Sequence, residues 1–193
     1  MKRLAHLTFN AFCSTYLRVL LACGLFFCCH SAGAAAVQHP MTITSPALQN
    51  HAAMPKRFTA DGRNISPPLA WRNVPKSTVS LVLVMVDPNA PGPQLFLHWI
   101  VINIPPTARG LTANLPHTKR IKNMPSVRQG ENSFGKTGYD GPAPPVGPPH
   151  HYRIILYALS RKLLFAPDCL PCLHHAMAGY ILARATLHVH YGR

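Results

Sequence analysis

The chain has 193 residues and a formal net charge of +14, because 19 lysines and arginines stand against 5 aspartates and glutamates. That length is enough for one domain with a sizeable core. The small number of carboxylates leaves few candidates for a hydrolase that uses a pair of them. The positive charge favours anionic partners, namely phosphorylated small molecules, anionic lipid surfaces or acidic proteins. A nucleic-acid partner is not expected, because the sequence contains no helix-turn-helix, zinc finger or strip of aromatic and basic residues.

Residues 1–34 have the three parts of a secretory signal peptide. A lysine and an arginine follow the first methionine, an uncharged apolar run covers residues 19–29, and the small residues Ala-Gly-Ala at 32–34 suit cleavage. The run has 11 residues, whereas a helix that spans a bilayer needs about 20. We therefore expect residues 1–34 to be removed, residues 35–193 to form the domain, and the protein to be periplasmic or secreted.

Two other interpretations of this segment are an uncleaved anchor and a misassigned start codon. A third is a lipidated Cys23, which would fit the preceding Leu-Leu-Ala. Lipidation ranks below simple cleavage, because Arg18 lies only five residues upstream of Cys23 and the apolar run continues past it.

Five segments of the remaining chain predict β-strands. Residues 78–86 form an apolar, β-branched run between two prolines, which indicates a strand buried on both faces. Residues 95–104 and 152–159 are similar runs. Residues 181–189 alternate between apolar and other side chains, a period of two that predicts a half-buried strand. Residues 41–44 predict a short edge strand.

A single helix and one long loop complete the expected elements. Residues 171–178 predict a helix, with a proline in its first turn and Gly179 at its end. Residues 130–149 hold five glycines and five prolines, a composition typical of a linker. Because strands flank this segment, we expect a structured loop instead. Short strands, proline-rich turns and one late helix indicate a mainly β protein, a sandwich with a helical appendage.

Cys169 and Cys172 are the two cysteines that remain after removal of residues 1–34. In an oxidising compartment this pair could close a disulfide. The Cys-Leu-Pro-Cys spacing also resembles a thioredoxin-type redox motif, but no βαβ unit surrounds it. A structural or incidental pair is therefore favoured over redox catalysis.

Three segments place polar side chains at the ends of apolar runs, beside proline-stiffened turns. Asp87 ends one run, His98 lies within the next, and His150 and Tyr152 open a third. Strand ends that meet rigid loops are common places for binding sites. Protonated histidines, a tyrosine hydroxyl and loop N–H groups suit a phosphate-like oxyanion. In the 141–145 loop the prolines have no N–H, so Gly141 and Ala143 are the expected donors.

Six short stretches stand out in chain order. They are DGRNISPPLAW (61–71), DPNAP (87–91), LHW (97–99), NSFGKTGY (132–139), GPAPP (141–145) and HHY (150–152). Together they resemble the phosphatidylethanolamine-binding protein family, in its bacterial Raf-kinase-inhibitor-like (YbhB/YbcL type) branch. The resemblance implies an antiparallel Greek-key β-sandwich, with a short C-terminal helix before the last strand.

The resemblance also implies which residues bind phosphoryl or carboxylate groups. These are Asp87, Pro91, His98, Ala143, Pro145, His150 and Tyr152. Residues 61–62 and 64–71 would support the site structurally. The chain departs from the family pattern at several positions: Asn89 replaces an aspartate, His151 replaces an arginine, and Ala60 and Ala143 stand where bacterial relatives often carry cysteine.

The sequence favours a non-catalytic binding or inhibitory protein. It contains no Gly-x-Ser-x-Gly elbow, His-Glu-x-x-His, phosphate loop or dinucleotide fingerprint. We expect no cofactor, and a small anionic ligand such as phosphate or a phospholipid head group. The alternative is a small hydrolase that uses Asp87, His98 and His150. The resemblance further implies a kinase- or protease-like protein target. Contact with an anionic membrane surface and formation of a homodimer are two further hypotheses.

His188 and His190 are the remaining pair with possible chemistry, because they share one face of the expected last strand. Two imidazoles on one face can chelate a metal ion, but the sequence suggests no third ligand. We therefore expect solvent-facing histidines and no metal site.

Overall fold

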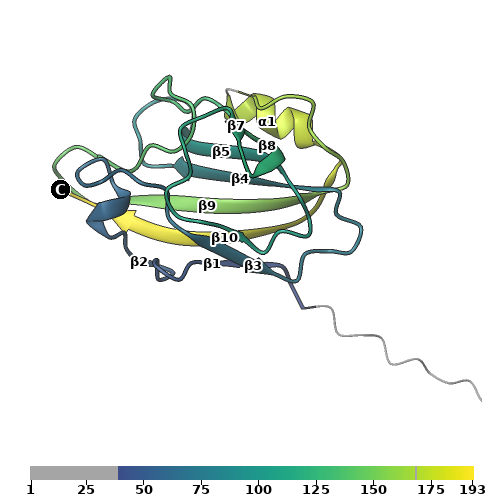
Figure 1. Ribbon diagram of the computed structural model, residues 1–193. Helices are drawn as coiled ribbons and strands as arrows, with labels where there is room; N and C mark the ends of the chain where they lie inside the picture. Colours follow the sequence, from purple (N-terminus) through teal and green to yellow (C-terminus); the bar gives the residue numbers. More distant parts are fainter. Residues whose placement is uncertain (1–38, 168) are drawn as a thin grey trace, which may run out of the picture. The chain divides into compact units, whose positions relative to one another are not determined.

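The computed structural model describes residues 39–167 and 169–193. The expected signal peptide, residues 1–34, and Cys23 within it lie outside the described residues. The described part of the chain contains two β-sheets and one short helix (Figure 1). None of its helices has the length and apolar character needed to cross a membrane.

The larger sheet has seven strands. In hydrogen-bonding order they are β2 (Ala52–Ala53), β10 (Ile181–Tyr191), β9 (His150–Leu159), β4 (Ser80–Asp87), β5 (Phe96–Ile104), β8 (Met124–Gln129) and β7 (Arg120–Ile121). Neighbouring strands are antiparallel except β2, which runs parallel to β10. The expectation of purely antiparallel sheets is therefore wrong at this edge, because the free backbone groups of an edge strand accept a partner in either direction.

The smaller sheet has three strands in the order β1 (Thr42–Thr44), β3 (Leu69–Arg72) and β6 (Gly110–Leu111). A short 3₁₀ turn, Lys56–Phe58, lies between β2 and β3 in the chain. β1 is at an edge of this sheet, as expected for residues 41–44. The sequence did not reveal β3 or β6, because strands of four and two residues are too short to show a period.

The two sheets share one hydrophobic core, and the helix covers a second. Leu81, Leu83 and Met85 of β4 pack with Ile43 and Trp71 of the small sheet. The alternate residues of β4 face the opposite side, where they pack with the buried residues of α1 (Leu170–Met177). β4 is therefore buried on both faces, as its apolar run predicted.

The mainly β fold with one short helix is confirmed, whereas the Greek-key arrangement stays a prediction. The bounds of β4, β5, β9, β10 and α1 agree with the expected segments to within two residues. The predicted alternation of β10 holds from Ala185 to Val189 but fails at its start, where Ile181 is 45% exposed. A register shift between Ile181 and Ala183 interrupts the period of two there.

Candidate functional site

A pocket lies at one end of the sheet face that packs on the smaller sheet. Met85 and Tyr152 belong to the core between the two sheets. Asp87 stands two residues after Met85 on β4, and His150 two residues before Tyr152 on β9. Because side chains two residues apart share a face of a strand, Asp87, His150 and Tyr152 point to the same side. All three line the pocket.

His98 joins this group through a β-bulge in β5. Met85 pairs with Trp99 and the next residue of β4, Val86, pairs with Leu97, so His98 is a surplus residue on β5. Leu97 packs in the cluster under α1, and Trp99 in the core between the sheets. A bulge changes the direction of a side chain relative to the regular strand. The bulge therefore directs His98, which is 3% exposed, to the pocket wall.

The ring of His98 is held by a backbone carbonyl. Its Nδ1 lies 2.7 Å from the carbonyl oxygen of Asp140. Because a carbonyl only accepts, Nδ1 carries the proton and donates it, which leaves Nε2 for the pocket. Burial lowers the pKa of His98 below its ordinary value, so the imidazole is neutral at pH 7. The sequence-based expectation of a cationic His98 therefore applies only in more acidic solution.

Asp87 holds the imidazole of His150 in the pocket. Its Oδ2 lies 2.7 Å from Nδ1 of His150, and its Oδ1 accepts the backbone N–H of Asn89 at 2.8 Å. Burial raises the pKa of Tyr152, and the negative charge of Asp87 acts in the same direction. The Tyr152 hydroxyl therefore remains a protonated donor at neutral pH. The carboxylate thus orients the imidazole of His150.

Asn89 forms a hydrogen bond at the start of β9, where two histidines are adjacent. Its Oδ1 accepts the backbone N–H of His151 at 2.8 Å. At this start of β9, His151 is exposed and His150 is half-buried against Asp87. The bond adds to the pairing of β9 with β4 and β10, which sets the register of these two histidines.

Asp140 is a supporting residue that the sequence interpretation missed. Its carboxylate accepts hydrogen bonds from Nδ2 of Asn64 at 2.8 Å and from Nδ2 of Asn132 at 3.2 Å. Its backbone N–H donates to the carbonyl of His98 at 3.1 Å, so Asp140 and His98 are joined in both directions. The one signal in the sequence is a carboxylate inside the glycine- and proline-rich loop, in a chain with only five acidic residues.

The 141–145 loop offers one of the two donors expected from its sequence. The N–H of Gly141 donates to Oδ1 of Asn64 at 2.7 Å, so the expectation that it is free for a ligand is wrong. A Cβ at Gly141 would collide with the carbonyl oxygen of Phe58 and approach Cα of Thr59 to 2.7 Å. Glycine is therefore required for this close approach, and Ala143 is left as the loop donor.

The structure brings all seven predicted residues together around one cavity of about 170 Å³. Four further lining residues were not predicted: Ala90, Phe96, Phe134 and Pro144. Phe96 and Phe134 meet edge to face at 4.8 Å between ring centroids, and Phe134 meets His98 in the same way at 5.5 Å. An apolar aromatic wall thus faces the polar group of Asp87, His98, His150 and Tyr152.

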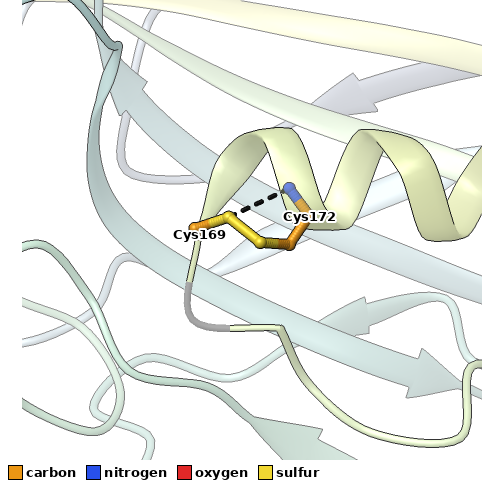
Figure 2. The surroundings of a disulfide bond; sticks show 2 residues. All are labelled: Cys169 and Cys172. Carbon is orange, nitrogen blue, oxygen red and sulfur yellow. Dashed lines mark hydrogen bonds between the residues drawn. A yellow bond between two sulfur atoms is a disulfide. The ribbon is translucent and has the colours of Figure 1, made fainter.

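The other candidate residues lie outside this pocket. Cys169 and Cys172 are joined by a disulfide at the start of α1 (Figure 2). His188 is half-buried, and its ring stacks on that of His51 at 4.9 Å. Burial lowers the pKa of His188. Within residues 39–167 and 169–193, no three histidine, cysteine or acidic side chains are grouped so as to hold a metal ion.

The sequence model of the family described as "Phosphatidylethanolamine-binding protein" matches residues 44–192. This chain belongs to the phosphatidylethanolamine-binding protein family. It is 41% identical over 152 residues to a UPF0098 protein of Methanothermobacter thermautotrophicus, which covers 76% of this chain and 95% of that protein. It is 45% identical over 100 residues to UPF0098 protein YbhB of Escherichia coli, covering 51% of this chain and 62% of YbhB. The putative lipoprotein LppC of Mycobacterium tuberculosis is 40% identical over 129 residues, covering 66% and 60%.

Two solved structures of the phosphatidylethanolamine-binding protein family are also similar. YbcL of Escherichia coli superposes with a TM-score of 0.74 at 27% sequence identity, covering 80% of this chain and 99% of YbcL. A putative phosphatidylethanolamine-binding protein homologue from Chlamydia trachomatis gives a TM-score of 0.70 at 34% identity, covering 80% and 98%. The expected family and its YbhB/YbcL branch are confirmed.

Proposed function

We propose that this protein is a non-catalytic binding protein that takes a small anionic group, such as phosphate or a phospholipid head group, into the pocket. The observation that carries the proposal is the contact of 2.7 Å between Asp87 and Nδ1 of His150, inside a cavity that His98 and Tyr152 also line. The carboxylate holds the ring so that its Nε2 is left for a ligand. When His150 is protonated, Nε2–H donates to an oxyanion with the strength of a charge-assisted bond.

The remaining donors of the pocket suit the same ligand class. The hydroxyl of Tyr152 and the N–H of Ala143 complete a set of donors around the cavity, while the lining includes neither lysine nor arginine. At neutral pH, Nε2 of His98 is an acceptor and fits the O–H of a monoprotonated phosphate. The net charge of +14 attracts anions to the protein as a whole.

The volume of the pocket restricts the ligand to a small group. A cavity of about 170 Å³ is smaller than the ~300–1,000 Å³ of a site for a drug-sized molecule. A phosphoryl or carboxylate group with a few further atoms fits, whereas the acyl chains of a lipid would remain outside. The proposal therefore concerns a head group or a free anion.

The lining residues favour binding over catalysis. The side chains around the cavity include no serine, threonine, cysteine or lysine that could serve as a nucleophile. The pKa of Tyr152 is raised, so its phenol is a poor nucleophile at neutral pH. The competing hypothesis is a small hydrolase that uses Asp87, His98 and His150. Turnover of chromogenic phosphate or ester substrates that is abolished in His98→Ala would favour the hydrolase.

Binding of the fully ionised anion sulfate should strengthen as the pH falls. Protonation of an imidazole adds a cationic donor, so affinity should rise by about tenfold or more between pH 8 and pH 5.5, across the range in which imidazoles ordinarily titrate. Because burial lowers the pKa of His98, its own contribution should appear only toward the acidic end. Isothermal titration calorimetry at both pH values measures this. Phosphate and phosphoethanolamine then compare the free anion with the head group.

Matched variants make this titration specific. His150→Ala and His98→Ala should each reduce the pH dependence, whereas His174→Ala, an exposed histidine on α1, should leave it unchanged. Equal affinity at both pH values, together with wild-type affinity in the two pocket variants, would end the proposal.

We propose that the protein acts in the periplasm or outside the cell. The charged start, apolar run and small residues of 1–34 support export. The name of the relative LppC, a putative lipoprotein, is compatible with an envelope location. N-terminal sequencing of the protein from an envelope or culture fraction should find a mature start near Ala35. An intact Met1 in the cytosolic fraction would contradict export, and a chain that begins with a lipidated Cys23 would support the lipoprotein alternative.

A further inference from the structure

The disulfide lies within the first turn of α1, away from the residues that line the anion pocket. Cys169 is the N-cap of the helix, and Pro171 stands in its first turn. Sγ of Cys169 accepts the backbone N–H of Cys172 at 3.0 Å (Figure 2). The carbonyl of Cys169 accepts the N–H of Leu173 at 3.0 Å. The sulfur of Cys169 thus occupies the place of the capping oxygen in an ordinary helix start.

A structural role for this bond is weak. A disulfide stabilises a fold mainly by restraining the unfolded chain, and its effect grows with the length of the closed loop. Here the loop contains only Leu170 and Pro171. The helix is held in place independently, because Leu170, Leu173 and Met177 are buried against the large sheet. The bond can therefore open and close while the domain stays folded.

The two sulfurs differ in access and in hydrogen bonding. Cys172 is exposed, and Cys169 is half-buried at the N-cap. The N–H that points at Sγ of Cys169 would stabilise a thiolate there, and the positive end of the helix dipole acts in the same direction. A sulfur whose thiolate is stabilised is the better leaving group in thiol–disulfide exchange. The geometry thus separates a sulfur that is open to attack from one that is suited to leave.

We propose that Cys169 and Cys172 form a redox-active disulfide that exchanges with the thiols of a partner. A partner thiolate attacks Sγ of Cys172, the intramolecular S–S bond breaks, and its electron pair passes to Sγ of Cys169. A second partner thiolate then attacks the partner's sulfur in the mixed disulfide and releases Cys172. Each released thiolate takes a proton from water. In sum, this protein gains two electrons and two protons, and two partner thiols become one disulfide.

The first test is an equilibrium of the full chain with glutathione buffers of graded redox ratio, without denaturant. Mass spectrometry after alkylation, read on the peptide that contains Cys169 and Cys172, reports the bond separately from the other cysteines. We expect the bond to pass from oxidised to reduced within the range of these buffers, with an unchanged circular dichroism spectrum. A bond that stays oxidised throughout, as structural disulfides do, or a domain that unfolds as the bond opens, would overturn the proposal.

Single variants test the order of attack. In Cys169→Ser the exposed Cys172 should form a mixed disulfide with glutathione that persists, because the resolving sulfur is gone. In Cys172→Ser the half-buried Cys169 should accumulate less adduct under the same conditions. An equal yield in both variants, or an adduct in neither, would contradict the assignment of Cys172 as the attacked sulfur.

The partner thiol can belong to a small molecule or to a polypeptide, and the rates distinguish these sources. The oxidised full chain is mixed separately with reduced glutathione and with a peptide that carries two cysteines, and the double variant Cys169→Ser/Cys172→Ser serves as the control. Faster oxidation of either thiol than in the control supports the proposal and identifies the partner class. Rates equal to the control for both would overturn it. The outcome is independent of anion binding, so failure here leaves the pocket hypothesis untouched.

Discussion

Substitution of Asp87 by asparagine should weaken anion binding by roughly 10- to 150-fold. Asparagine retains an oxygen for the N–H of Asn89 but removes the charge that orients His150. Loss of one charge-assisted hydrogen bond costs about 1.5–3 kcal/mol, which corresponds to that range of affinity. The melting temperature should change little, because the side chain keeps its volume. Calorimetric titration with sulfate and a thermal melt of the same preparation measure both quantities.

The control for Asp87→Asn is Glu131→Gln, which also removes one negative charge but from an exposed residue outside the pocket. We expect wild-type affinity in this variant, so that a general change in the protein's electrostatic field is separated from a local effect. If Asp87→Asn binds sulfate normally but melts at a far lower temperature, Asp87 is a structural residue at the end of β4 and the ligand binds elsewhere.

Asp140→Ala should have the largest effect on stability of the changes considered. It removes the acceptor for the side-chain amides of Asn64 and Asn132, and an unsatisfied buried donor costs about 1–3 kcal/mol. Asn64 is only half-buried and the amide of Asn132 also donates to the carbonyl of Gly138, so we expect a loss of roughly 1–4 kcal/mol, equivalent to about 2–15 °C in melting temperature for a domain of this size. Urea denaturation and a thermal melt test this. Sulfate binding should also fall, because the loop carbonyl that holds His98 would shift.

Lys136→Met is the matched control for Asp140→Ala. Its ammonium lies 3.6 Å from the Asp140 carboxylate, but its side chain is 64% exposed. A surface ion pair contributes about 0–1 kcal/mol, so this variant should melt close to the wild type. A comparable loss in both variants would show that the ion pair, rather than the buried amide bonds, stabilises the loop. A wild-type melt for Asp140→Ala would show that the network contributes little.

The sequence was most informative where a polar side chain lies at the end of an apolar run that predicts a strand. Asp87 directly follows an apolar run and directly precedes Pro88, so its place at the end of a buried strand could be inferred from neighbouring residues alone. The same holds for Tyr152 at the start of a similar run. The motifs around them also pointed to the correct family, which local physics alone could not have named.

Two features of the site could not be inferred, and each depends on contacts between distant segments. The support for His98 comes from Asp140, 42 residues later, and nothing local in the loop indicates which strand it contacts. The bulge at His98 is equally hidden, since a surplus residue exists only relative to the pairing with β4. Hydrogen bonding also explains why the prediction for Gly141 was wrong. The sequence suggests that its N–H is available to a ligand, but in the fold this N–H donates to Oδ1 of Asn64.

Because His98 is the surplus residue of the bulge in β5, the strand can exist with or without it. Leu97 and Trp99 already face opposite sides of the sheet, as neighbours in a regular strand do. A gene that lost the codon for His98 would therefore still encode a strand with correct alternation of its apolar side chains, while the loop at Asp140 would lose its two hydrogen bonds to His98. One codon inserted or deleted at this position would thus add or remove the imidazole without reversing the face to which the neighbouring side chains point.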